Sequence, residues 1–403
     1  MENFETLGLP RVLMQALAHL KFTAPTPIQA EAIPHAMAGK DVLGSAQTGT
    51  GKTGAFGIPL IAHLLKNPEA GALVMTPTRE LATQVMGLLE QLLGANSGIR
   101  TALLIGGESM PKQLRQLSAR PRLIVGTPGR INDHLARRSV KFTTTDFLVL
   151  DETDRMLDMG FGVQIDKILA HMPAKRQTLL FSATLPANIV KLSGKYLTDP
   201  VRVSVGDTHL PIERIKQENI ILKEDDKYGQ LLVQLQQREG SIIVFVKTKY
   251  GTERMAKKLC AINHSADAIH GDLRQNQRDK AIASFRSKST RIMIATDIAA
   301  RGLDIPHIEH VINYDMPQCP EDYIHRIGRT ARNGAEGQAV NLITSQDNKK
   351  WKAIQRLLNP NAKPEHIPGG EGGALKEGRK PFKKRRYGNS RKPGQHRPMQ
   401  KAA

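Results

Sequence analysis

The sequence predicts an α/β protein with two tandem parallel-sheet domains followed by a disordered basic tail. Three observations predict this class. Short apolar runs alternate with longer helical patterns through the first half of the 403-residue chain. The same alternation begins again at about residue 213, and beyond Asn359 glycine, proline and basic residues replace it. Alternating strand and helix patterns indicate β–α–β units, whose parallel strands are connected by helices.

The first domain is expected to span residues 1–205, and helical stretches such as Arg79–Leu93 separate its strands. A segment containing glycine and proline, residues 206–212, is expected to be the linker. The apolar runs that predict the strands are Asp41–Leu43, Ala72–Met75, Thr101–Ile105, Leu123–Val125, Phe147–Leu150 and Thr178–Phe181.

The second domain is expected at residues 213–359 and the tail at residues 360–403. Residues 361–403 contain 12 Lys and Arg against 3 Glu and no Asp, so they carry a net charge of +9 out of +20. They have too few apolar residues to offset the cost of ordering. The tail either keeps the protein in solution or attracts RNA phosphates. The strands expected in the second domain are Ser241–Val246, Arg291–Ala295, His310–Tyr314 and Gln338–Ile343.

Composition narrows the class of protein. A pI near 10.0 indicates a polyanionic partner such as nucleic acid, although ribosome-associated and membrane-surface proteins share this property. Cys260 and Cys319 form neither a disulfide framework nor a metal-binding spacing, which favours a reduced, cytoplasmic compartment. Neither a secretory signal nor a membrane-spanning segment is expected.

The first motif with chemical meaning follows a strand run and opens a helical pattern. Glycines let backbone N–H groups turn towards phosphate, and a helix N-terminus adds partial positive charge. The spacing predicts a phosphate-binding loop in which Lys52 reaches the β- and γ-phosphates and Thr53 binds Mg²⁺. The alternative is a chance loop, and Ala46 replaces the usual first glycine. The loop residues are Ala46, Gln47, Thr48, Gly49, Thr50, Gly51, Lys52 and Thr53.

An acidic turn, Asp151-Glu152-Thr153-Asp154, directly follows the apolar run Phe147–Leu150. Carboxylates at the carboxyl end of a strand lie where open α/β sheets bind ligands. We expect Asp151 to hold Mg²⁺ and Glu152 to polarise the attacking water as general base. Without the phosphate-binding loop upstream, the same turn would be interpreted as a solvated acidic loop.

An arginine-rich segment, residues 325–332, lies in the second domain and reads His-Arg-Ile-Gly-Arg-Thr-Ala-Arg. On a helix, Arg329 and Arg332 would share one face. Two guanidinium groups on one face suit a γ-phosphate and its transition-state charge. They could reach that phosphate only when the two domains close. The alternatives are a basic RNA-contact helix and a surface of ion pairs.

The chain resembles the DEAD-box RNA helicases over residues 4 to about 345. This resemblance implies two RecA-like domains, ATP and Mg²⁺ as cofactors, RNA as partner, and ATP hydrolysis coupled to RNA clamping and local duplex unwinding. Besides the three motifs above, the matching segments are residues 22–29 (Phe-Thr-Ala-Pro-Thr-Pro-Ile-Gln), Pro77–Ala82, Gly106–Gly107, Thr127–Arg130, Ser182–Thr184, Gln275–Arg278 and Ala295–Asp304.

On the nucleotide side, the resemblance implies that Gln29 reads the adenine edge and Phe4 stacks on the adenine ring. A glutamine side chain can pair with adenine through two hydrogen bonds, which would favour ATP over GTP. Asp304 should touch the ribose. The residues expected to link hydrolysis to domain movement are Asp154, Ser182, Thr184 and His325, with Ser182 and Thr184 bonded to Asp154.

On the RNA side, the resemblance implies contacts from both domains. Aromatic residues make up only 4% of the chain, so a platform that stacks bases is not expected. Contacts to phosphate and ribose position a strand without reading its sequence, so we expect sequence-tolerant binding. The implied RNA contacts are Pro77, Thr78, Arg79, Gly107, Thr127, Arg130, Arg278, Thr296 and Asp297.

Two positions depart from the family pattern. Thr153 replaces the family's alanine, and Lys21 stands where glycine is common. The flanking carboxylates and Gln29 are retained, so we expect the chemistry to survive. The compact core and short basic tail are similar to bacterial members of the RhlE-like group, which implies a role in ribosome assembly, RNA decay or growth in the cold.

Three other functions stay open on the sequence alone. An ATP-gated RNA clamp would use the same motifs without unwinding. The basic tail could make the protein an annealing chaperone. A DNA helicase of the same superfamily is the third alternative, and both the Gln29 motif and residues 325–332 are evidence against it.

Overall fold

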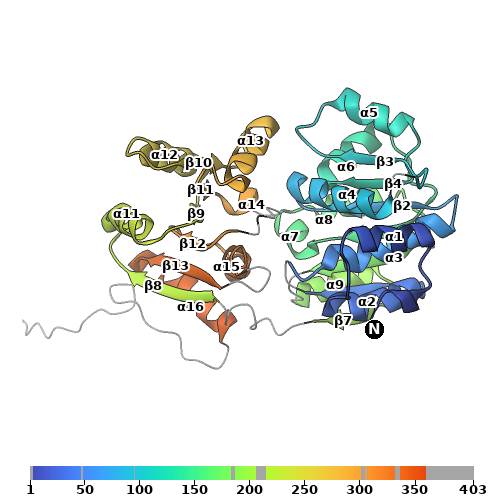
Figure 1. Ribbon diagram of the computed structural model, residues 1–403, viewed down its shortest axis with the longest axis horizontal. Helices are drawn as coiled ribbons and strands as arrows, with labels where there is room; N and C mark the ends of the chain where they lie inside the picture. The colour runs from blue at the N-terminus through green and yellow to red at the C-terminus, as the bar shows by residue number, and fades with distance from the viewer. Residues whose placement is uncertain are drawn as a thin grey trace, which may run out of the picture.

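The computed structural model describes residues 3–46, 49–94, 96–182, 187–205, 215–300, 305, 307–331 and 336–359. These residues form two α/β lobes that lie side by side (Figure 1). We call residues 3–205 the first lobe and residues 215–359 the second lobe. The linker predicted at 206–212 and the tail predicted at 360–403 lie outside the described residues, so both remain predictions.

The first lobe is built on seven parallel strands in the order β3-β4-β2-β5-β6-β1-β7. The strands are β1 (Val42–Ser45), β2 (Gly71–Met75), β3 (Thr101–Leu104), β4 (Leu123–Gly126), β5 (Thr145–Leu150), β6 (Gln177–Ser182) and β7 (Val201–Ser204). The helices are α1 (Arg11–His19), α2 (Pro27–Met37), α3 (Lys52–Lys66), α4 (Arg79–Leu93), α5 (Met110–Ser118), α6 (Pro128–Ala136), α7 (Thr153–Asp158), α8 (Gly162–Leu169) and α9 (Ala187–Tyr196).

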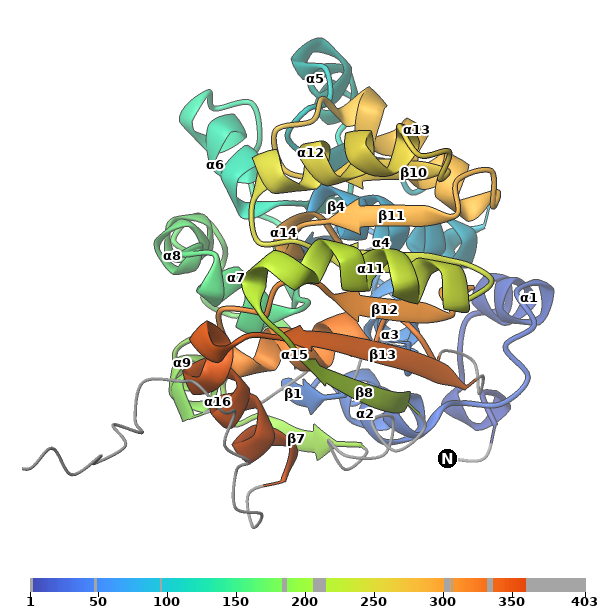
Figure 2. The same cartoon turned by 90° about the vertical axis from the view of Figure 1, so that its left-hand side faces the viewer.

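The second lobe is built on six parallel strands in the order β10-β11-β9-β12-β13-β8, seen from its outer side in Figure 2. The strands are β8 (Ile215–Ile221), β9 (Ile242–Phe245), β10 (Ala266–Ile269), β11 (Ile292–Ala295), β12 (His310–Asn313) and β13 (Gly337–Ile343). The helices are α11 (Lys227–Gln237), α12 (Lys249–Cys260), α13 (Gln275–Arg286), α14 (Asp297–Ala300), α15 (Pro320–Ile327) and α16 (Asn348–Leu358).

Both faces of each sheet are buried under helices. Along β1, Val42 belongs to one buried cluster and Leu43 to the cluster on the opposite face. Along β9, Ile242 and Ile243 divide between two clusters in the same way. Strands buried on both faces are apolar at nearly every position, which explains why continuous apolar runs marked them in the sequence.

The central strands were predicted within about two residues, whereas β7, β8 and β10 were missed. All three missed strands lie at an edge of their sheet. An edge strand has a neighbour on one side alone, and these three keep partly or fully exposed positions. Their polar residues therefore hid the strand pattern.

Candidate active site between the two lobes

The phosphate-binding loop predicted at residues 46–53 connects β1 to α3. Gly49 and Gly51 have φ angles of 86° and 91°, a region that L-residues rarely adopt. A Cβ at Gly51 would also lie 2.6 Å from Gln29 Nε2, so glycine is needed there for two reasons. Lys52 is buried, and its Nζ donates to the Ala46 carbonyl at 2.7 Å. The ammonium group must leave this carbonyl to reach a phosphate. Gln47 and Thr48 lie outside the described residues.

Gln29 connects the start of α2 to this loop. Its Oε1 accepts a hydrogen bond from the Thr26 amide at 3.0 Å, and its Nε2 donates to the Gly51 carbonyl at 3.0 Å. The side chain is buried, so its position is fixed from two sides. Phe4 is also buried and packs against Phe22, with ring centroids 6.2 Å apart. The contacts that both residues are expected to make with adenine remain predictions.

The acidic turn follows β5, as the sequence predicted, and its first two carboxylates are buried. Asp151 Oδ1 accepts a hydrogen bond from the Glu152 amide at 3.0 Å. Burial raises the pKa of Asp151 to about 7, against the opposing influence of Lys52. A buried carboxylate with a raised pKa gains from a bound cation, so Asp151 fits the Mg²⁺ ligand that the sequence predicts.

Glu152 adopts a left-handed backbone conformation, with φ 51° and ψ 50°. Burial by itself would raise the pKa of its carboxyl group, but Arg155, Lys52 and Arg329 together hold that pKa below its ordinary value. Glu152 is therefore ionised at neutral pH, which is the state that a general base requires. Arg329 belongs to the second lobe, so both lobes contribute positive charge near this carboxylate.

Thr153 has room in this turn. Its side chain is fully buried, and its hydroxyl donates to the Leu150 carbonyl at 3.2 Å. The hydroxyl is therefore satisfied by the end of β5, and the carboxylates on either side keep their places.

Arg155 was not identified from the sequence. It is a fully buried side chain on α7, and its Nη1 donates to Glu152 Oε2 at 2.8 Å. Its residue type alone does not distinguish it from an arginine on a helix surface. One available signal was the spacing of three residues from Glu152, at which helical side chains are neighbours.

The coupling residues are described in part. Ser182 ends β6 and is buried, and its carbonyl accepts a hydrogen bond from the Ala46 amide at 3.1 Å. This contact places the end of β6 beside the phosphate-binding loop. Asp154 Oδ1 accepts from the Arg155 amide at 3.0 Å. Thr184 lies outside the described residues, so the hydrogen bonds expected between Asp154 and this segment remain predictions.

The predicted helix carrying Arg329 and Arg332 is wrong. Helix α15 ends at Ile327, Gly328 follows as its C-cap, and Ala331 has a φ angle of 56°, which no helix tolerates. Arg329 therefore lies in the turn after the helix, where its Nε donates to the His325 carbonyl at 3.1 Å. Arg332 lies outside the described residues, as does Asp304, so the roles predicted for both are untested.

Arg326 stabilises the end of α15, although no role was predicted for it. Its guanidinium group binds both carboxylate oxygens of Asp297, at 2.5 and 2.8 Å, and also donates to Asn313 Oδ1 at 3.0 Å. The group lies 4.8 Å from the centroid of the Phe245 ring. Asp297 was predicted to contact RNA. In this structure both of its carboxylate oxygens accept hydrogen bonds from Arg326, and the RNA contact stays a prediction.

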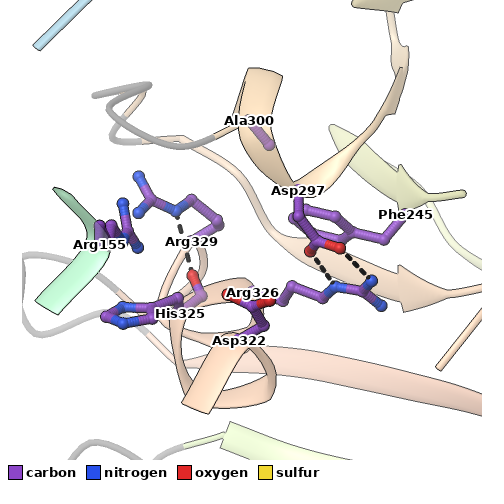
Figure 3. A pocket seen from close by; sticks show the side chains of 8 residues that line it. All are labelled: Arg155, Phe245, Asp297, Ala300, Asp322, His325, Arg326 and Arg329. Atoms are coloured by element: carbon purple, nitrogen blue, oxygen red, sulfur yellow. Dashed lines mark hydrogen bonds and ion pairs between the residues drawn. The ribbon is translucent and has the colours of Figure 1, made fainter. Parts of the chain in front are cut away.

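A small pocket lies between the lobes, and Figure 3 shows the side chains around it. Arg155 comes from the first lobe, and the other lining residues come from the second. Three arginines and two aspartates line this pocket, so charge of both signs is concentrated there. The lining residues are Arg155, Phe245, Asp297, Ala300, Asp322, His325, Arg326 and Arg329.

The predicted RNA contacts lie mostly at the carboxyl ends of strands. Pro77, Thr78 and Arg79 follow β2, Gly107 lies beyond β3, and Thr127 follows β4. In the same lobe, Arg130 is on α6; in the second lobe, Thr296 follows β11, Asp297 begins α14 and Arg278 is on α13.

Two of these residues bridge the lobes. Arg79 Nη1 donates to Gln275 Oε1 at 3.3 Å. Arg278 binds Glu80 Oε1 through its Nε at 2.7 Å and its Nη2 at 2.6 Å. Both guanidinium groups therefore hold the lobes together, and their contacts with RNA remain predictions.

Comparison with known proteins identifies the family of the chain. The DEAD/DEAH box helicase family matches residues 26–192, and the helicase conserved C-terminal domain matches residues 225–334. The ATP-dependent rRNA helicase RRP3 of Yarrowia lipolytica is 43% identical over 360 residues, which cover 89% of this chain and 75% of that protein. The chain belongs to the DEAD-box ATP-dependent RNA helicases. A bacterial member, CshA of Bacillus subtilis, is 41% identical over 88% of this chain and 72% of its own length.

The lobes of this DEAD-box helicase are arranged much as in a relative that holds both ligands. The Saccharomyces cerevisiae structure titled Dbp5 bound to RNA and ADP BeF3 gives a TM-score of 0.80 at 30% identity, covering 89% of this chain and 94% of that one. A DEAD box protein from Methanococcus jannaschii is 38% identical and covers similar shares, 89% and 97%, yet its TM-score is 0.51. The structural match is therefore closer to the relative with the lower sequence identity.

The predicted family, α/β fold and enzyme class are therefore confirmed: the protein is an ATP-dependent RNA helicase that binds ATP and RNA. No helix within the described ranges is both long enough and apolar enough to cross a bilayer.

Proposed function

We propose that this helicase hydrolyses ATP with Glu152 as general base and Arg329 as the arginine finger, and that hydrolysis is tied to RNA clamping and local duplex unwinding. The observation that carries the proposal is that Arg329 of the second lobe lines the same pocket as Arg155 of the first lobe, whose Nη1 donates to Glu152 Oε2 at 2.8 Å. The base and the finger come from different lobes, so the site is complete only when the lobes are together. Arg332 is proposed to join Arg329 at the γ-phosphate.

The nucleotide would lie along the phosphate-binding loop. Lys52 would exchange the Ala46 carbonyl for the β- and γ-phosphates, and Gln29 would read the adenine edge while Phe4 packs against the ring. Asp304 would bind the ribose. These roles are supported by the position of the loop between β1 and α3 and by the bond from Gln29 to Gly51.

Thr53 and Asp151 are proposed to hold Mg²⁺. Among the described residues, no three carboxylate, histidine or cysteine side chains gather to form a metal cage. This fits Mg²⁺, which usually keeps waters and binds one or two carboxylates together with substrate phosphates. When bound, the ion offsets the negative charge of the β- and γ-phosphates.

RNA is proposed to cross the carboxyl ends of the strands in both lobes, in contact with the nine residues predicted from the sequence. Asp154, Ser182, Thr184 and His325 would transmit the state of the nucleotide to the lobes. His325 supports this role, because its carbonyl accepts from Arg329 and its side chain lines the pocket between the lobes.

The cellular role is proposed from the relatives. RRP3 is named an rRNA helicase, which supports structured RNA in ribosome assembly as the substrate, with RNA decay and growth in the cold as the other roles expected from the sequence. Cys260 and Cys319 are free thiols, which supports the cytoplasmic compartment predicted above.

The test combines RNA dependence with removal of the base. ATP turnover should rise strongly with single-stranded RNA, because RNA and ATP together favour the closed lobes. Glu152→Gln should lower turnover by about 10²–10⁴-fold, as loss of a general base does, while ATP-dependent RNA binding persists. Equal turnover with and without RNA, or near-native turnover of the variant, would contradict the proposal.

Truncation after Asn359 tests the tail. Log affinity for a single strand falls against log salt with a slope of about −0.7 per phosphate neutralised, so removal of the tail's positive charge should flatten the salt dependence of ATP-independent RNA binding. Maximal ATPase at saturating RNA should stay unchanged, because all the catalytic motifs lie before the truncation point. An unchanged salt slope would show that the tail does not touch RNA.

A further inference from the structure

Arg155 is buried in a way that is costly for a charged side chain. Its side chain is 1% exposed, and Glu152, its ion-pair partner at 2.8 Å, is 4% exposed. The Arg155 Nε and Nη2 atoms have no hydrogen-bond partner. Unpaired donors in a protein interior lose their bonds to water, and each such group in a native protein calls for an explanation.

Stability does not explain this pair. A buried ion pair is often no more stable than well-packed apolar residues of the same volume, because both charges lose their hydration. Glu152 also has a positive φ of 51°, a conformation that costs free energy in any L-residue and is common at functional sites. The strain and the two unpaired donors occur together at the proposed general base.

This costly burial of Arg155 occurs at the interface between the lobes. Figure 3 shows Arg155 on α7 of the first lobe, beside Arg329 and His325 of the second lobe. One guanidinium nitrogen holds the carboxylate of Glu152, and the guanidinium group also lines the pocket that the lobes share. Arg155 is thus the first-lobe residue that contacts the general base and lines this pocket.

We propose that Arg155 is a positioning residue for ATP hydrolysis: it fixes the carboxylate of Glu152 in the orientation needed to accept a proton from the attacking water. The inference rests on the proposed role of Glu152 as general base. Arg155 itself need not touch the nucleotide, because it acts through the hydrogen bond from Nη1 to Glu152 Oε2.

Two substitutions separate this role from packing. Arg155→Met keeps most of the side-chain volume and removes the bond to Glu152. Because a misplacement of about 1 Å can cost about 10²-fold, kcat should fall by about that factor, whereas the KM for ATP should change little. Arg155→Lys keeps the charge and one donor, so its kcat should lie clearly between that of Arg155→Met and the wild type.

A double-mutant cycle shows whether Arg155 acts through Glu152. In the Glu152→Gln background there is no carboxylate left to orient, so adding Arg155→Met should change the residual single-turnover rate by less than about twofold. This double variant also removes both charges of the pair. If Arg155→Met alone does not fold, Arg155→Lys in the two backgrounds takes its place, and a fall in kcat confined to the wild-type background is the expected result.

Arg122→Met is the matched control. Arg122 is also in the first lobe, but its guanidinium group donates to the carbonyls of Ala70 and Leu64, both at 2.8 Å, away from the acidic turn. This variant should lower the melting temperature and leave kcat unchanged.

Three results would overturn the inference: an unchanged kcat in Arg155→Met, an equal loss in the Glu152→Gln background, or a loss of kcat in Arg122→Met as large as that in Arg155→Met. Failure of the proposed function would look different, because Glu152→Gln itself would then keep its turnover.

Discussion

Glu80 and Arg278 form a buried ion pair between the lobes. Glu80 Oε1 accepts from Arg278 Nη2 at 2.6 Å and from Nε at 2.7 Å, and the two side chains are only 6% and 7% exposed. Arg278 Nη1 also donates to the His270 carbonyl at 2.9 Å, which directs the guanidinium group towards the first lobe. Since the partners lie on different lobes, opening the lobes breaks the pair. Glu80→Gln should therefore weaken the closed arrangement specifically.

The size of this effect follows from burial. Truncating one partner of a buried, hydrogen-bonded charge pair costs about 2–5 kcal/mol. A glutamine oxygen still accepts one hydrogen bond, so we take the lower end, about 2 kcal/mol, which is about 30-fold in the equilibrium between closed and open lobes. RNA binding and closure are coupled, so the RNA concentration at half-maximal ATPase should rise by up to about 30-fold. The kcat at saturating RNA should change little, because no catalytic group is altered.

ATPase titrations with single-stranded RNA measure this shift. The control is Glu108→Gln, which breaks an exposed pair within the first lobe, Glu108 to Lys112 at 3.0 Å, and should change nothing. If Glu80→Gln folds normally and its RNA titration matches that of the wild type, the closed arrangement seen here is not the one that hydrolyses ATP.

Three further predictions concern the first lobe. Lys21 has a φ of 58°, so Lys21→Gly should stabilise the protein by up to about 1 kcal/mol in thermal unfolding; a lower melting temperature would contradict this. Gln29→Ala should relax the preference for ATP over GTP and, because Gln29 also holds the Gly51 carbonyl, raise the KM for ATP; unchanged discrimination would refute the adenine contact. Burial is the main cause that lowers the pKa of His134 from 6.5, and the charge of Arg130 is the second. The free energy of unfolding should therefore reach its full value above pH 6.5 and decline as the pH falls below it. Urea unfolding between about pH 5 and 8 should show this decline in the wild type and a smaller one in His134→Gln.

The sequence predicted those parts of the molecule whose local structure requires particular residue types. The loop at residues 46–53 needs glycines for its backbone and a lysine for phosphate, so a short segment carries its own signature. The buried central strands were visible for the same reason, since both faces demand apolar residues. The edge strands β7, β8 and β10 were not predicted, because their solvent-exposed positions tolerate polar residues.

Contacts made by the tertiary fold could not be predicted in this way. Arg278 and Glu80 are 198 residues apart, and no pattern in the sequence pairs them. Arg326 looks like a surface arginine until the fold brings Asp297, 29 residues earlier in the chain, to it. The helix expected through Arg329 failed because Gly328 ends α15, and a glycine in this position could equally have been tolerated within a helix.

The two sheets share one strand order, but among the described residues only the first lobe has a phosphate-binding loop. Read in chain order, β8 to β13 occupy the same places in their sheet as β1 to β6 do in theirs. The second lobe therefore has a counterpart of the nucleotide site, beyond the ends of β8 and β12. There Lys227 begins α11 as Lys52 begins α3.

The surroundings of the two lysines decide their different roles. Between β8 and α11 lie Glu224, Asp225 and Asp226, where the first lobe has its glycine-rich loop. Lys227 is buried against carboxylates, 3.2 Å from Glu224, 3.5 Å from Asp315 and 3.9 Å from Asp347. The positive charge of Lys227 is offset by these carboxylates. The acidic turn as a whole therefore repels phosphate rather than attracting it. The second lobe thus keeps the fold of a nucleotide-binding domain without its charge, and its proposed contribution to hydrolysis is Arg329 at the interface. If Arg329 acts as proposed, this asymmetry makes hydrolysis of a single ATP depend on the relative position of the lobes.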